Sequence, residues 1–125
     1  MPEGPGVFSL GQIALSAAVG TLGAFVVAWL YGRAAGDAAP PVSESVVLAL
    51  LTGLSILVWR LAGNTASLNE DPIPVVSPND VLCPVVTYVV LGLYAGVRGT
   101  AAHPRWPHVR AALTVLSLIV NVVTI

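Results

Sequence analysis

The chain has 125 residues, of which 56% are hydrophobic and 9% are charged, and its net charge at neutral pH is −1. Ordinary soluble domains carry roughly 25% charged residues, so this composition argues against a soluble fold and indicates a chain that lies in a lipid bilayer. Because one spanning helix uses about 20 residues, four spans fill most of the chain and exclude a separate soluble catalytic domain.

The first predicted helix covers residues 7–31, an apolar stretch without a charged residue. It is long enough to cross a bilayer with some tilt. A cleaved signal peptide is the alternative, but the start of the chain carries no Lys or Arg and the apolar run exceeds the hydrophobic region of a signal. Small residues recur at every fourth position on one face of this helix, where another helix could approach closely. This row consists of Ser16, Gly20, Ala24, Ala28 and Gly32.

The second predicted helix covers residues 46–62 and follows a break rich in glycine and proline. Ser43 is the expected N-cap of this helix. Glu44 follows in the first turn, where the helix dipole favours an acidic group.

A polar segment at residues 64–80 comes next, and its prolines predict a loop rather than a helix. Arg60 lies just ahead of this loop, near the end of the second helix. Two interpretations of Arg60 stay open. It either extends its charged group to the lipid headgroups or forms an ion pair with Asp80, Asp71 or Glu70.

The third predicted helix covers residues 81–98. Ser77 and Pro78 precede it and have the features of a helix start, with the serine as cap and the proline in the first turn. Gly92 and Gly96 repeat the four-residue spacing of small residues found in the first helix. Such rows favour close helix packing, either within one protomer or between copies, and the spacing does not distinguish the two.

The last predicted helix covers residues 108–125 and carries polar residues at alternating steps of four and three. This polar stripe consists of Arg110, Thr114, Ser117, Asn121 and Thr124. Polar groups that faced lipid would lack hydrogen-bond partners, so the stripe is expected to face protein or a wet cavity. Its hydroxyls can bond carbonyls of their own helix in a packed interface, or the stripe can line a pore.

Arginine gathers on one side of the predicted membrane, in Arg33, Arg98, Arg105 and Arg110. The positive-inside rule places this side in the cytoplasm, so both termini and the 64–80 loop are expected outside. Aromatic residues also mark the two interfaces, with Trp29, Tyr31, Tyr94 and Trp106 on the inner side and Trp59 on the outer side. All five basic residues are Arg, and this usage is typical of a GC-rich bacterial or phage genome. We therefore expect a bacterial or phage-encoded protein of an inner or cell membrane.

The sequence offers no arrangement of residues typical of catalysis, and we expect a non-enzymatic protein. No serine or threonine has a base at a suggestive spacing. Cys83 is the single cysteine, which excludes an internal disulfide, while His103 and His108 have no further metal ligands nearby in the sequence. No metal or cofactor is therefore expected. The chain lacks a basic run, so nucleic acid is not an expected partner.

The predicted fold class is all-α: a polytopic membrane protein with a bundle of four transmembrane helices, in one domain over residues 1–125. The first functional hypothesis is an accessory or scaffolding subunit of a membrane complex, whose partners are the lipid bilayer and other membrane subunits or copies of itself. The second is a self-assembling pore lined by the last helix, and the chain resembles phage holins in size and layout, although not in any motif. The third is a small-molecule transporter, which the lack of charge in the middle of the spans argues against.

Overall fold

A computed structural model of the chain describes residues 8–34, 42–64, 78–98 and 106–124. These residues form four α-helices, which are α1 (Leu10–Ala34), α2 (Val42–Ala62), α4 (Pro78–Arg98) and α5 (Trp106–Thr124). Each helix is long and apolar enough to cross a membrane. The all-helical fold class and the four apolar helices are thus confirmed, and they indicate a multi-pass membrane protein.

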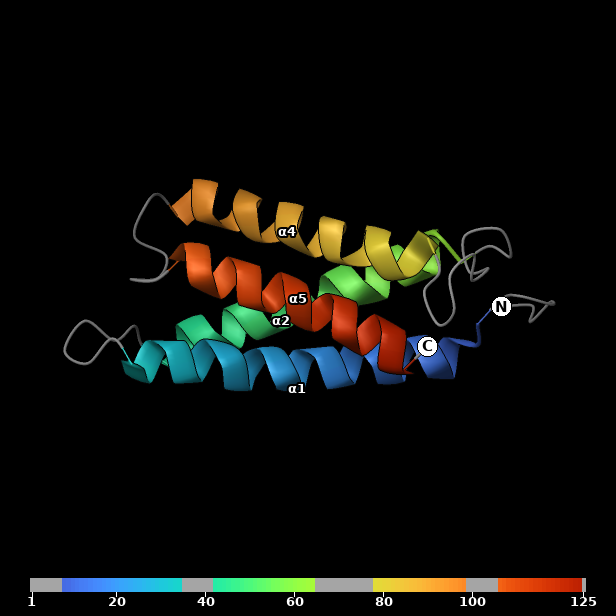
Figure 1. Cartoon of the computed structure of the whole chain (residues 1–125), viewed down its shortest axis with the longest axis horizontal. Helices are drawn as coiled ribbons and strands as arrows, with labels where there is room; N and C mark the ends of the chain where they lie inside the picture. Colours follow the sequence, from blue (N-terminus) through green and yellow to red (C-terminus); the bar gives the residue numbers. More distant parts are fainter. Residues whose placement is uncertain (1–7, 35–41, 65–77, 99–105, 125) are drawn as a thin grey trace.

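The four helices lie along a common long axis, and consecutive helices run in opposite directions (Figure 1). α1 packs against α2 and α5, and α4 packs against the same two helices. Each helix therefore has two principal neighbours. We name the two ends of this arrangement by residues that lie there. The Arg60 end is where α1 and α4 begin and α2 and α5 finish, and the Tyr94 end is the opposite one.

The start of α1 lies at Leu10, later than the predicted start at residue 7, because Ser9 and Gln12 form a capping box. The Ser9 hydroxyl accepts a hydrogen bond from the Gln12 amide at 3.1 Å, and Gln12 Oε1 accepts one from the Ser9 amide at 3.2 Å. Two amide groups at the helix start, which have no partner within the helix, are satisfied in this way. At its other end α1 continues to Ala34 rather than stopping at residue 31.

α2 begins at Val42, so Ser43 lies inside its first turn and is not the N-cap that the sequence predicted. Proline precedes Val42 in the sequence, and a helix start tolerates proline because the amides there have no intrahelical partner. The helix can therefore begin before the serine. Glu44 lies in the first turn, as predicted.

α4 begins at Pro78, also ahead of the predicted boundary, and its first turn includes Asn79 and Asp80. The prediction that Pro78 lies in the first turn is confirmed, whereas the bounds that gave Asn79 and Asp80 to the 64–80 loop are wrong, because both residues belong to the helix. Proline at the first helical position keeps its preferred backbone geometry without losing a hydrogen bond. The predicted cap Ser77 and residues 65–77 as a whole lie outside the described part of the chain.

Apolar side chains fill the interior in two clusters. The cluster toward the Tyr94 end contains Leu48, Leu91 and Leu113, all fully buried and each from a different helix. The cluster toward the Arg60 end includes Ile56 and Val120. The apolar layer of Leu48, Leu91 and Leu113 thus separates the polar groups of the two ends, which are described below.

α1 and α2 approach each other closely at Gly53. A Cβ atom added at Gly53 would clash with the Thr21 side chain and would lie 3.1 Å from the Ala17 carbonyl oxygen. The Thr21 hydroxyl donates to that same carbonyl at 2.8 Å. Because the obstruction includes backbone, a side chain at this position would push the two helices apart.

Candidate functional site: a buried polar network

The guanidinium of Arg60 joins three helices at one point. Arg60 on α2 is 1% exposed, and its Nη2 donates to Asp80 Oδ1 on α4 at 2.5 Å. Its Nε donates to Asn121 Oδ1 on α5 at 2.6 Å. The structure therefore pairs Arg60 with Asp80, one of the three acidic residues considered from the sequence. The burial of Arg60 does not fit the alternative in which its charge reaches the lipid headgroups.

Hydroxyl groups continue this network from the ion pair to the middle of α2, α4 and α5. Asn121 Nδ2 donates to the Ser117 carbonyl at 2.6 Å, and the Ser117 hydroxyl lies 2.9 Å from that of Thr87 on α4. The Thr87 hydroxyl lies 2.7 Å from that of Ser55 on α2, which in turn donates to the Thr52 carbonyl at 2.7 Å. Each interhelical bond of this kind contributes about 0.6 kcal/mol on average in a membrane. The network therefore stabilises the contact of three helices because it contains several such bonds, not because any one of them is strong.

The segment before α1 covers the network at the Arg60 end. The Phe8 amide donates to Asn64 Oδ1 at 3.0 Å, and Asn64 Nδ2 donates to the Phe8 carbonyl at 2.9 Å. This reciprocal pair places the Phe8 ring over the Arg60 guanidinium, with 5.8 Å from the ring centroid to Cζ. Trp59 Nε1 donates to Asn79 Oδ1 at 3.1 Å and adds a second contact between α2 and α4. Arg60 is thus buried although it lies close to the end of its helix.

One donor of the network has no partner within the described residues. Arg60 Nη1 is buried, and it is the one buried side-chain nitrogen or oxygen atom in that part of the chain without a hydrogen-bond partner. The charge of the guanidinium is balanced by Asp80, so this nitrogen can hold a neutral acceptor such as a water molecule without adding net charge. The network is therefore close to complete as it stands.

A smaller set of polar contacts lies at the Tyr94 end. Glu44 is 4% exposed, and its Oε1 accepts a hydrogen bond from the Tyr94 hydroxyl at 2.8 Å. Arg110 donates from Nη2 and Nε to the Tyr88 carbonyl at 2.7 and 3.0 Å, and its guanidinium lies 3.4 Å from the Tyr88 ring centroid. Glycine at position 92 makes room for this guanidinium, because an added Cβ atom would clash with it.

The small-residue row of α1 faces the interior of the chain. Its five members are all buried, namely Ser16, Gly20, Ala24, Ala28 and Gly32. A Cβ atom at Gly20 would lie 2.5 Å from Ile56 Cδ1 on α2 and 3.8 Å from Val120 Cγ1 on α5. In this structure the row packs helices of one protomer. Gly96 on α4 differs, since it is exposed and a Cβ atom there would meet nothing within 4 Å in the described chain.

The polar stripe of α5 divides into two parts. Ser117 and Asn121 are 0% exposed and belong to the network. The Thr114 and Thr124 hydroxyls donate to the carbonyls four residues earlier at 2.8 and 2.6 Å, and Thr124 also lies 2.8 Å from the Ser16 hydroxyl on α1. Arg110 turns toward α4. The stripe therefore contacts its own protomer along most of its length.

Sequence reasoning missed the partners that α2 and α4 contribute to the network. Thr52, Ser55, Asn79 and Thr87 are buried and hydrogen-bonded, yet none of them was singled out. A usable signal was present: Asp80 and Thr87 are seven positions apart and therefore share one face of α4. No group of three or more His, Cys, Asp or Glu in the described residues could hold a metal ion.

Comparison with protein families, curated proteins and solved structures gives no match for this chain. Function therefore has to be inferred from the four helices, their buried network and the surfaces that they leave exposed.

Proposed function

We propose that the chain is a non-enzymatic membrane protein that serves as an accessory or scaffolding subunit of a larger membrane complex. Its four helices would form a transmembrane bundle, and the length and apolar character of each helix support this placement. In this proposal the interior of the protomer holds the four helices together. The outer helix faces contact lipid and partner subunits.

The observation that carries this proposal is the inward direction of Ser117 and Asn121. A pore lined by the α5 stripe requires these groups to face an opening between copies of the chain. Both are instead fully buried, with Ser117 against Thr87 and Asn121 bonded to Arg60 of the same protomer. Turning them outward would break the bonds that join α5 to α2 and α4, so the geometry supports an accessory role over a pore.

The buried ion pair favours a transporter as the second candidate. Charged residues inside a membrane span are rare and often belong to a transport pathway. Arg60 and Asp80 supply such charges, which the sequence had placed at the membrane edge. A pathway would also have to pass the apolar layer of Leu48, Leu91 and Leu113, which is fully buried in this structure. Transport would therefore require a second arrangement of the helices.

The outer face of α4 is the surface that we propose for the partner. Its exposed residues Val85, Val89, Leu93 and Val97 lie at helical spacing, and Val97 is 88% exposed. Gly96 lies next to this ridge, with open space around it. Burying aliphatic side chains from lipid gains little, so helix association in a membrane depends on close approach at small residues. Gly96 would permit that approach.

The test is purification of the tagged chain from its native membrane in nanodiscs, followed by mass spectrometry of the intact assemblies. The parent should carry other membrane proteins in a fixed ratio. Gly96→Leu should lose them, while Ala18→Leu, at an exposed position on α1, should retain them. Because position 96 is open, its variant should fold as the parent does, which circular dichroism checks.

Two outcomes would refute the accessory role. The first is a closed homo-oligomer without other chains, which would favour the pore. The second is an isolated protomer that takes up a solute into proteoliposomes only when Arg60 and Asp80 are both present, which would favour the transporter.

A further inference from the structure

Arg110 on α5 places a positive charge beside the middle of α4. Its guanidinium donates from Nε and Nη2 to the Tyr88 carbonyl at 3.0 and 2.7 Å. Tyr88 is the central residue of α4, which extends over Pro78–Arg98. At 1.5 Å per residue this helix is about 30 Å long, and Tyr88 lies about 15 Å from either end. The hydrocarbon core of a bilayer is also about 30 Å thick, so Tyr88 would lie near its centre.

The contacts of the guanidinium hold it away from the end of the bundle. It lies 3.4 Å from the Tyr88 ring centroid, and a Cβ atom at Gly92 would clash with it. Gly92 comes six residues before Arg98, the last residue of α4. The guanidinium therefore lies between about 9 and 15 Å from that end of the helix. An arginine near a helix end commonly extends its charge to the headgroups, whereas Arg110 turns toward the middle of α4.

No carboxylate balances this charge in the part of the chain that the structure describes, where the one ion pair joins Arg60 to Asp80. Glu44 is the other acidic residue of the four helices, and it is buried and accepts a hydrogen bond from Tyr94. Arginine keeps its charge in proteins, and a charge in the middle of a span is costly unless it meets a partner or water. The Tyr88 carbonyl and ring offset part of this cost, and a carboxylate would offset more.

The guanidinium lies at an outer face of the protein. Tyr88 is 46% exposed, and Arg110 is half-buried. A hollow of about 340 Å³ between α4 and α5 is lined by Tyr88 together with apolar residues such as Val85 and Leu118. Val85 also belongs to the ridge that we propose as the partner surface. The unbalanced charge and the proposed partner surface are therefore adjacent.

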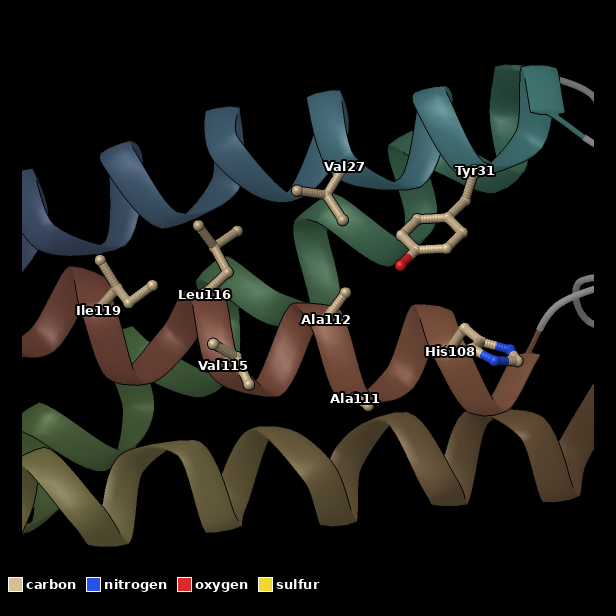
Figure 2. Close-up of a pocket in the computed structure, with 8 residues that line it drawn as sticks. All are labelled: Val27, Tyr31, His108, Ala111, Ala112, Val115, Leu116 and Ile119. Carbon is tan, nitrogen blue, oxygen red and sulfur yellow. The ribbon is translucent and has the colours of Figure 1, made fainter.

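The hollow between α1 and α5 carries no comparable charge (Figure 2). It has a volume of about 470 Å³, and its walls are aliphatic except for Tyr31 and His108 near one end. Among the described residues, no arginine, lysine or carboxylate lines it, so its chemistry does not select a class of ligand. The face formed by α4 and α5 differs, because Arg110 defines the charge of its complement.

The complement of this face is a carboxylate within a membrane span. A carboxylate brings the opposite charge and accepts hydrogen bonds from a guanidinium. Lipid phosphates lie in the headgroup region, at least about 9 Å away along α4. A second copy of the chain offers no exposed carboxylate from its four helices, because Glu44 and Asp80 are both buried. The acidic group therefore has to come from a different membrane protein.

We propose that Arg110 docks the chain on a partner membrane helix that carries an Asp or Glu in the middle of its span. The carboxylate would meet the guanidinium over Gly92, one helical turn from the open position at Gly96. On the partner, the acidic residue and the residue that packs on Gly96 would be about 6 Å apart, which is one turn of a helix. This inference rests on the proposed accessory role and adds the chemistry that selects the partner.

The first test is purification from native membranes in nanodiscs with a variant at position 110. Arg110→Met should reduce the co-purified partner at least about tenfold, because the partner's carboxylate loses its counter-charge. Arg33→Met is the matched control. It also removes an exposed arginine stacked on an aromatic ring, that of Trp29 at 4.9 Å, and it should retain the partner. Circular dichroism should show the same helix content for both variants and the parent.

The second test identifies the acidic residue. A photo-crosslinker at position 85, which is exposed and one turn from Tyr88, should label a partner peptide that contains an Asp or Glu within about two helical turns. Arg110→Asp should lose this partner. Replacing the identified acidic residue of the partner by arginine should restore binding to Arg110→Asp, since the exchange recreates the pair with its charges reversed.

The outcomes separate this inference from the accessory role. The inference is overturned, and the accessory role stands, if Gly96→Leu loses the partner while Arg110→Met keeps it, or if the labelled peptide contains no acidic residue. A crosslink to lipid alone or to a second copy of the chain would also overturn it, as would failure of the charge exchange. A parent chain that carries no other protein would refute both proposals.

Discussion

Substitution of Asp80 by alanine should destabilise the protein, because it leaves the guanidinium of Arg60 buried without a counter-charge. The two side chains are 1% and 5% exposed and lie 2.5 Å apart. Breaking a buried ion pair by removing one partner costs about 3–5 kcal/mol. Arg60 would keep its bond of 2.6 Å to Asn121, and it lies near the end of α2, from where it can turn toward the interface. We therefore expect a loss of about 3 kcal/mol, which is on the order of a hundredfold in the unfolding equilibrium constant.

Removing both charges should be far less harmful than removing one. The double variant Arg60→Met with Asp80→Leu keeps similar volumes and no longer requires a charge to be desolvated. Its stability should lie within about 1 kcal/mol of the parent, since apolar replacement of a buried pair is often neutral. The losses of the single variants Arg60→Met and Asp80→Leu should therefore be non-additive, with a coupling free energy of about 2 kcal/mol or more.

The assay is reversible unfolding in mixed micelles of dodecylmaltoside and dodecylsulfate, followed by circular dichroism. Arg33→Met is the control, because Arg33 is exposed and stacks on Trp29 at 4.9 Å. That control should change the free energy of unfolding by no more than about 1 kcal/mol. A loss below about 1 kcal/mol for Asp80→Ala, or a double variant as unstable as the sum of both single variants, would refute the reasoning.

Two further predictions use the same assay. Gly53→Ala should cost about 1–3 kcal/mol or more because the Ala17 backbone is in the way, whereas Gly96→Ala, with nothing within 4 Å, should be neutral or stabilising. Equal effects of the two substitutions would contradict the close approach of α1 and α2. Thr87→Val should cost about 1–2 kcal/mol because it removes contacts to two helices, whereas Thr114→Val, whose hydroxyl bonds only its own helix, should cost no more than about 0.5 kcal/mol. If both variants behaved alike, the network would contribute nothing measurable.

The sequence predicted the number and type of the elements because hydrophobic runs of spanning length leave no alternative in lipid. Backbone groups in hydrocarbon must bond within their own segment, so each such run has to be a helix. The exact helix starts depend on local interactions at the first turn, such as capping hydrogen bonds. The Ser9–Gln12 capping box was legible in the sequence but was overlooked. α2 begins earlier than Ser43 had suggested, and α4 begins at the Pro78 turn rather than at residue 81. Polar character alone does not separate a loop residue from a buried first turn.

The candidate site was less predictable, because it depends on which helix faces meet. The sequence placed Ser117 and Asn121 on one stripe and allowed a pair between Arg60 and Asp80, but it could not reveal that all four side chains belong to one network. Helix periodicity shows which residues share a face. It does not show which neighbouring helix that face contacts, because this depends on how the helix is rotated in the bundle. The cover over Arg60 was unpredictable for the same reason, since the Phe8–Asn64 pair that forms it joins residues far apart in the chain.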